Sequence, residues 1–175
     1  MENIDNFEQV KPSEIRSKIP EKSGIYIITV NKNKIINFKD LLCVNLKDLF
    51  CELNLKTIRL DKESNNLVIY VGMSENLKER ISGHLNGGDA TTFGFSMIAA
   101  GLNIKDINIR EKDEFFTIYY KQVEFAESKL IEEYDPPFNL SGVTKNTKHS
   151  EFRTKLKKKR KEILENYQPK KKRNK

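Results

Sequence analysis

The 175-residue sequence has no tryptophan, only two cysteines and no long run of apolar residues. Its apolar stretches fall well short of the roughly 18 consecutive residues that a membrane-spanning helix needs. Residues 1–22 are polar and charged, without the apolar segment of a secretory signal. These absences predict a cytoplasmic protein with no membrane partner.

Cysteine and histidine are too scarce for a protein-only zinc site. Cys43 and Cys51 would need two further ligands, and the histidines, His84 and His149, lie far from both in the sequence. A disulfide is unfavourable in a reducing compartment. We therefore expect two buried free thiols.

The formal net charge of +7 is unevenly distributed. Residues 153–175 carry a net charge of +10, whereas residues 1–152 carry −3. Such a basic segment is typical either of a solvated solubility tail or of an arm that binds phosphates without sequence preference. The residues that such an arm would use are Lys157, Lys158, Lys159, Arg160 and Lys161.

The order of apolar runs predicts one small mixed α/β domain, of the α+β type, over residues 1–152. β-branched and aromatic residues favour three strands, at 24–30, 67–72 and 114–121. Leucines at helical spacing indicate a helical insertion over 31–66. Further helices are expected at 74–85, with Ser74 as N-cap and Gly87-Gly88 beyond its end, and at 92–100, 123–134 and 152–167. Residues 153–175 form a basic C-terminal helix and tail, and we expect disorder from Pro169 onward.

Glu127 is the carboxylate that fits least well on a solvated face. On the helix predicted over 123–134 it lies roughly 40° from Val123, inside the apolar stripe. A carboxylate there is destabilising by several kcal/mol, about 3 or more, unless it is paired, hydrogen-bonded or bound to a metal. Taken alone, a structural salt bridge is the better explanation.

Four other polar residues are ambiguous when taken singly. Arg80 and His84, four apart along one edge of a helix, could reach one phosphate or form an exposed basic edge. Tyr26 and Tyr70 fit ordinary strand packing. Asn139 follows two prolines and could be a turn residue.

Taken in order, these residues resemble the GIY-YIG nuclease superfamily. Gly24-Ile25-Tyr26 matches the first signature tripeptide, and Tyr70-Val71-Gly72 matches the second with Val for Ile. Arg80, His84, Glu127 and Asn139 follow in the family's order, the histidine as in its restriction-endonuclease branch. The likeness spans about residues 23–141. The longer segment between the tripeptides also looks like that of restriction enzymes.

The resemblance implies a mainly antiparallel sheet and a DNA endonuclease with Tyr26, Tyr70, Arg80, His84, Glu127 and Asn139 as catalytic residues. Glu127 would bind one Mg²⁺ or Mn²⁺ per active site, with water and phosphate completing its shell. Arg80 would hold the scissile phosphate, and Tyr26 is our candidate general base. Tyr70 and His84 would orient water and phosphate or relay the proton, and Asn139 would hold the site together by hydrogen bonds.

Three functions remain open at this point. The first is a restriction-type enzyme that cuts DNA at a short site as a homodimer. The second is a nicking or structure-selective nuclease of repair or mobile elements, and the third is a non-catalytic DNA-binding module. The intact residue set counts against the third. Base readout could come from the insertion or from residues 83–94.

Overall fold

The computed structural model describes residues 6–31, 33, 66–86, 92–99, 104–122, 127–140 and 149–166. The strands are β1 (Glu8–Val10), β2 (Gly24–Asn31), β3 (Asn66–Ser74) and β4 (Phe116–Lys121). The α-helices are α1 (Ile15–Lys18), α5 (Leu77–Leu85), α6 (Thr92–Ala99), α7 (Ile109–Phe115), α8 (Glu127–Tyr134) and α9 (Ser150–Asn166), with 3₁₀ turns η2 (Pro12–Glu14) and η4 (Ile104–Asp106).

The sheet is four-stranded and antiparallel, with the strand order β1-β4-β2-β3. The mixed α/β class and the antiparallel pairing agree with the sequence-based expectation, but the count of three strands was wrong. The additional strand, β1, pairs with β4 at the edge of the sheet. Its three residues, Glu-Gln-Val, hold one apolar side chain, and so no β-branched or aromatic run marks it in the sequence.

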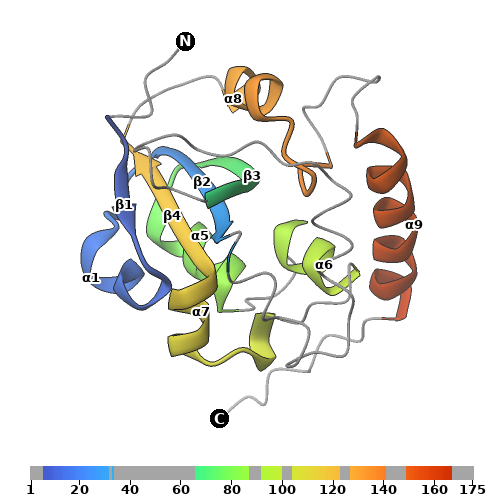
Figure 1. The fold of residues 1–175 in the computed structure, drawn as a ribbon, viewed down its shortest axis with the longest axis horizontal. Coiled ribbons are helices and arrows are strands. Elements are labelled where there is room, and N and C mark those ends of the chain that lie inside the picture. Colours follow the sequence, from blue (N-terminus) through green and yellow to red (C-terminus); the bar gives the residue numbers. More distant parts are fainter. Residues whose placement is uncertain are drawn as a thin grey trace.

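Both faces of the sheet are covered, which explains why β2 is buried along nearly its whole length. One face carries Tyr26, Ile28 and Tyr120 and packs against α5, α6 and the segments around α1 and α7 (Figure 1). The other face carries Ile25 and Val68 and packs against α8, in a separate apolar cluster. The two tripeptides thus lie side by side in the middle of the domain, since β2 pairs directly with β3.

The start of a helix and the start of a strand differ from the predicted positions. The N-cap of α5 is Asn76, not Ser74, because the Asn76 side chain accepts a hydrogen bond from the Glu79 amide. The third predicted strand begins at Phe116, because residues 109–115 form α7 instead. Asn108 caps α7 in a capping box with Glu111, which is a local signal that outweighs the aromatic content of Phe115.

Some expectations fall on residues outside the described ranges. They are the helix inserted between the first two strands, the thiols of Cys43 and Cys51, the Gly87-Gly88 stop and the tail from residue 167. The predicted helix over 123–134 is described from Glu127 onward. The boundary expected between residues 152 and 153 lies inside α9, which runs without a break from Ser150.

The outer edge of β3, which pairs with no further strand among the described residues, is covered by the turn after α8. The Phe138 amide donates to the Ile69 carbonyl at 3.1 Å, at the point where a register shift bends the β2–β3 ladder. Asp135, in the left-handed region at φ 45°, turns the chain out of α8. The same Asp135 accepts a hydrogen bond from Arg153 of α9 at 2.6 Å. This turn therefore connects α8, the sheet edge and α9.

Candidate active site

Tyr26 lies at the centre of the sheet, opposite Gly72 in the β2–β3 ladder. Its ring covers the glycine: a Cβ built on Gly72 would stand 2.4 Å from the phenol carbon and oxygen of Tyr26. No side chain fits there without displacing the tyrosine. The glycine of the second tripeptide therefore makes room for the tyrosine of the first.

Gly24 is needed for a different close approach. A Cβ at this position would lie 2.3 Å from the Lys121 carbonyl oxygen and 2.7 Å from a methyl carbon of Leu77. The missing side chain allows β4 and the start of α5 to pack directly on β2. This contact sets where α5 begins relative to Tyr26.

His84 of α5 is buried beside Tyr26, with 1% of its surface exposed. The Tyr26 hydroxyl and His84 Nε2 are hydrogen-bonded at 2.6 Å, and the tautomer decides which of the two donates. Burial, followed by the nearby charge of Arg80, lowers the pKa of His84 to about 3. The imidazole is therefore neutral near pH 7, and its buried Nδ1 has no hydrogen-bond partner among the described residues.

The Tyr26 phenol is as well shielded from solvent as His84. It is 1% exposed, and burial raises its pKa well above the ordinary value of 10. The neighbouring Tyr70 and Glu127 raise the pKa further, whereas the positive charge of Arg80 opposes them. Tyr26 is therefore protonated at neutral pH in the DNA-free protein.

Tyr70 lies on the same face of the sheet but on the edge strand β3, and it is only partly buried. Its ring centroid is 6.1 Å from that of Tyr26 and 5.3 Å from that of His84. Burial, then the negative charge of Glu127, raises its pKa. Its interaction with the Tyr26 hydroxyl and the charge of Arg80 act in the opposite direction.

Arg80 has an exposed side chain that forms no ion pair within the described part of the chain. His84 is buried, so the two residues do not form the exposed basic edge that was the alternative to a shared phosphate site. On the helical wheel His84 lies roughly 60° from Ile81, inside the buried stripe, and Arg80 lies roughly 40° further out. One turn of α5 thus carries a buried neutral base and an exposed cation.

Glu127 begins the described part of α8 and is partly buried, while Leu130 and Ile131 of that helix are fully buried. No hydrogen bond or ion pair reaches its carboxylate from the residues that the structure describes, so the salt bridge considered from the sequence has no partner there. Burial raises its pKa above the ordinary value. Its negative charge contributes to the raised pKa values of both Tyr26 and Tyr70.

Asn139 is 3% exposed, and both ends of its amide are used by the sheet edge. The Val71 amide donates to Asn139 Oδ1 at 2.9 Å, and Asn139 Nδ2 donates to the Val71 carbonyl at 2.7 Å. The side chain therefore replaces the missing neighbouring strand next to Tyr70. Asn139 lies behind the site rather than in its open part.

Phe93 of α6 was not singled out from the sequence, yet it packs against the site. Its ring centroid is 5.1 Å from Tyr70 and 5.5 Å from His84. The sequence predicts the helix around Phe93 but not this contact, because contacts between distant elements produce no periodic pattern in the sequence. Phe93 completes the set of apolar side chains that shield His84 from water.

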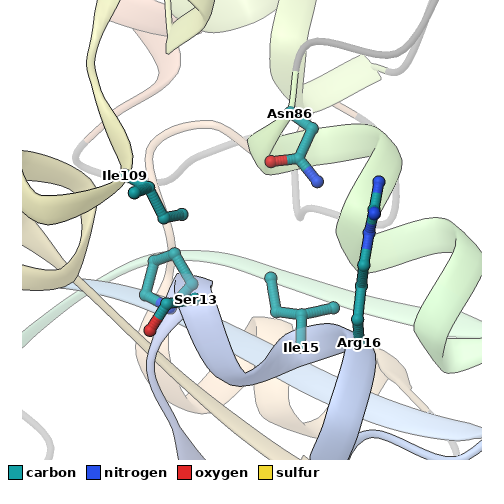
Figure 2. A pocket seen from close by; sticks show the side chains of 6 residues that line it. Ser13, Ile15, Arg16, Asn86 and Ile109 are labelled. Atoms are coloured by element: carbon teal, nitrogen blue, oxygen red, sulfur yellow. The ribbon is translucent and has the colours of Figure 1, made fainter.

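The α9 lysines 157, 158, 159 and 161 are exposed, whereas Arg160 is partly buried. A separate pocket lies between η2, the end of α5 and the start of α7 (Figure 2). Arg16 and Asn86 are among the residues that line it, and it contains none of the candidate catalytic residues. This pocket is therefore separate from the cluster of Tyr26, Tyr70 and His84.

The donor set fits a hydrated Mg²⁺ ion better than zinc. Among the described residues, no three His, Cys, Asp or Glu side chains gather into a metal site. Mg²⁺ keeps several of its waters and often takes one or two carboxylates together with substrate phosphates. A partly buried carboxylate without a cationic partner, such as Glu127, meets that requirement.

Comparison with protein-family models identifies the type of domain. The family model of the GIY-YIG catalytic domain matches residues 24–162, from the start of β2 to near the end of α9. No curated protein and no solved structure matches the chain significantly. Within the described residues, no helix is long and apolar enough to cross a membrane.

Proposed function

Because this chain belongs to the GIY-YIG nuclease family, we propose that it is a divalent-metal-dependent endonuclease that hydrolyses phosphodiester bonds in DNA. Within that class we propose a restriction-type enzyme that cuts at a short site. The observation that carries the proposal is the cluster of Tyr26, Tyr70 and His84 from β2, β3 and α5. The charges of Arg80 on α5 and Glu127 on α8 act on both tyrosines.

Glu127 is the proposed ligand of one Mg²⁺ or Mn²⁺ ion. When bound, the ion would polarise the phosphate and offset the negative charge that develops during hydrolysis. The described residues contribute a single carboxylate there, so we expect metal binding to be weak without DNA. Burial raises the pKa of Glu127, and a metal ion binds only its carboxylate form. Protons therefore compete with the metal ion for this side chain as the pH falls.

Arg80 is the proposed contact to the scissile phosphate. Its guanidinium is exposed, carries no ion pair within the described ranges, and acts on the pKa of both tyrosines and of His84. An arginine fork can bind two phosphate oxygens at once, and the binding strengthens as charge develops on them.

Tyr26 and His84 are the proposed proton acceptors, with Tyr70 as the more accessible phenol between them and the solvent. A buried phenol with a raised pKa is a poor base by itself. Tyr26 can accept a proton from water or from Tyr70 if it passes its own proton to His84 Nε2, 2.6 Å away. A phosphate bound nearby would favour protonated His84 and so assist this transfer.

Asn139 and the basic residues of α9 have proposed supporting roles. Asn139 would hold β3, and with it Tyr70, by its two hydrogen bonds to Val71. The exposed α9 lysines would bind the DNA backbone. Cutting both strands at one site would require two active sites, and a homodimer would supply them.

The experiment that tests the function is digestion of mixed plasmid and phage DNA with Mg²⁺, comparing the wild type with Glu127→Gln. This variant keeps the shape of the side chain and removes the charge. Discrete fragments that disappear in the variant would support a site-specific endonuclease. Nicked circles or junction-specific products would favour the structure-selective alternative. Salt-sensitive binding without cleavage in any divalent metal would exclude the enzymatic proposal and leave a binding module.

A further inference from the structure

Arg160 differs from the other basic residues of the C-terminal helix. Its neighbours Lys158, Lys159 and Lys161 are exposed, whereas the Nε atom of Arg160 is fully buried and has no hydrogen-bond partner among the described residues. Arg153 and Leu156 are buried on the same helix, and Arg160 follows them at spacings of seven and four residues. Arg160 therefore lies on the inward stripe of α9.

Helix α9 is held against the catalytic part of the domain at two levels. At its N-terminal end, Arg153 donates to Asp135 and to the Pro136 carbonyl, which lie in the turn that carries Asn139. Further along, Leu156 joins the large core cluster that contains Tyr26. Figure 1 shows α9 standing beside α6, on the side of that helix away from the sheet.

A continuous series of aromatic contacts links α9 to the site. The ring of Phe152 in α9 packs edge-on against Phe138 at 5.8 Å, Phe138 packs against Phe93 at 6.0 Å, and Phe93 packs against Tyr70 at 5.1 Å. Packed aromatic rings of this kind fix the relative position of the elements that carry them. Independently of this packing, the positive charge of Arg160 acts to lower the pKa of Tyr70, against the larger effect of burial.

We propose that Arg160 is a second arginine of the active site, which binds a DNA phosphate beside Tyr70. Helix α9 would then be part of the catalytic site rather than an appended basic segment, and the family match supports this because it extends to residue 162. A guanidinium with a buried Nε loses less side-chain freedom on binding phosphate than an exposed lysine does. The inference rests on the proposed nuclease function for its substrate.

The test is single-turnover cleavage at saturating protein by Arg160→Ala, Arg160→Lys and the control Arg16→Ala, which removes an exposed arginine at the separate pocket. Arg160→Ala should lower the maximal rate by about 10²-fold, as removal of a charge-stabilising group does. The rate of Arg160→Lys should lie between those of the wild type and Arg160→Ala, and Arg16→Ala should keep the wild-type maximal rate. Wild-type maximal rates in both Arg160 variants would overturn the proposal. If Arg160→Ala does not fold, Arg160→Lys decides alone.

A second measurement separates failure of this inference from failure of the proposed function. In DNA-free protein with ¹³C-labelled tyrosines, the ring signal of Tyr70 is identified by its loss in Tyr70→Phe. This signal should shift in Arg160→Ala and stay in place in Lys158→Ala. If the wild type cleaves no DNA, the nuclease proposal fails while the placement of Arg160 is still tested. An unchanged Tyr70 signal in Arg160→Ala would overturn that placement.

Discussion

The candidate site has two halves that differ in their contact with water. The buried half consists of Tyr26 on the central strand β2 and His84 on the inward face of α5, each 1% exposed. The open half consists of Tyr70 on the edge strand β3, Arg80 and Glu127, all partly or fully exposed. A phenol therefore occurs in each half, and the two differ chiefly in the position of their strands.

This difference separates stability from chemistry. In the buried half a polar atom that loses its partner stays away from water, so each change should affect both folding and activity. In the open half a side chain can return to water when its partner is removed, so activity should change with little effect on folding. The predictions below test this contrast.

Arg80→Ala should have the largest effect on catalysis. We expect cleavage at saturating protein to slow by about 10² to 10³-fold, because one charge-stabilising donor is lost. The melting temperature should stay close to that of the wild type, since the side chain is exposed. Cleavage rates and thermal unfolding of the same preparations check both points.

The matched control is Arg16→Ala, which removes an exposed arginine at the separate pocket of Figure 2. This control should cleave like the wild type. An equal loss in both variants would mean that Arg80 acts through overall charge rather than through a phosphate contact.

Tyr26→Phe and Tyr70→Phe should both slow cleavage, by about 10²-fold each if both phenols carry protons. They should differ in stability. Tyr26→Phe leaves buried His84 Nε2 without its partner and should lower the free energy of unfolding by about 1–3 kcal/mol. Tyr70→Phe should change it by less than about 0.5 kcal/mol, as for a group that water can reach.

Urea unfolding of the two phenylalanine variants measures this difference. Equal losses of stability would contradict the division into a buried and an open half. A Tyr70→Phe protein that cleaves at the wild-type rate would remove Tyr70 from the proton path and leave Tyr26 to act directly.

Gly72→Ala should destabilise the fold, because the new Cβ would stand 2.4 Å from the Tyr26 phenol. Overpacking of this kind costs about 1–3 kcal/mol. In the double variant Tyr26→Ala/Gly72→Ala the clash is absent, so the second substitution should cost clearly less than it does alone. A double-mutant cycle by urea unfolding measures the coupling, and additive effects would contradict the contact.

His84 should make stability depend on pH. Its folded pKa of about 3 lies below the ordinary 6.5, so the unfolded chain binds more protons than the folded one between these values. Stability from this group is complete above pH 6.5 and falls with decreasing pH, by about 1.4 kcal/mol per pH unit within the window. The difference in unfolding free energy between wild type and His84→Gln, followed from pH 7 to 4, isolates this contribution. A difference that does not vary with pH would contradict it.

Part of the fold could be read directly from the sequence. The strands around Tyr26 and Tyr70 and the helix that carries Arg80 were predicted close to their observed bounds, because β-branched runs and apolar helical spacing act locally. Strand β1 could not be found this way, since pairing with β4 rather than composition holds it in the sheet. The capping box of Asn108 and Glu111 was a local signal for α7 that the aromatic residues after it obscured.

The candidate site shows the same division. A nuclease family is indicated by the order of the signature residues alone, because the reaction requires particular residue types. These are the two tripeptides, the arginine, the histidine, the glutamate and the asparagine. The sequence alone could not tell that His84 is dry while Arg80, one turn away, is exposed. This difference in exposure arises because Phe93 and the sheet pack against one side of α5.

The order of residues along the chain thus sets which chemical groups this protein carries and which local elements hold them. Packing between distant elements sets which of those groups are shielded from water, and therefore which are neutral, which are charged and which can reach a phosphate. Glu127 shows both contributions: the helical pattern placed it within an apolar stripe, and packing beside the sheet raised its pKa. The physical reason is that solvation depends on neighbours that are distant in the chain, whereas helix and strand periodicity depend on neighbours that are close.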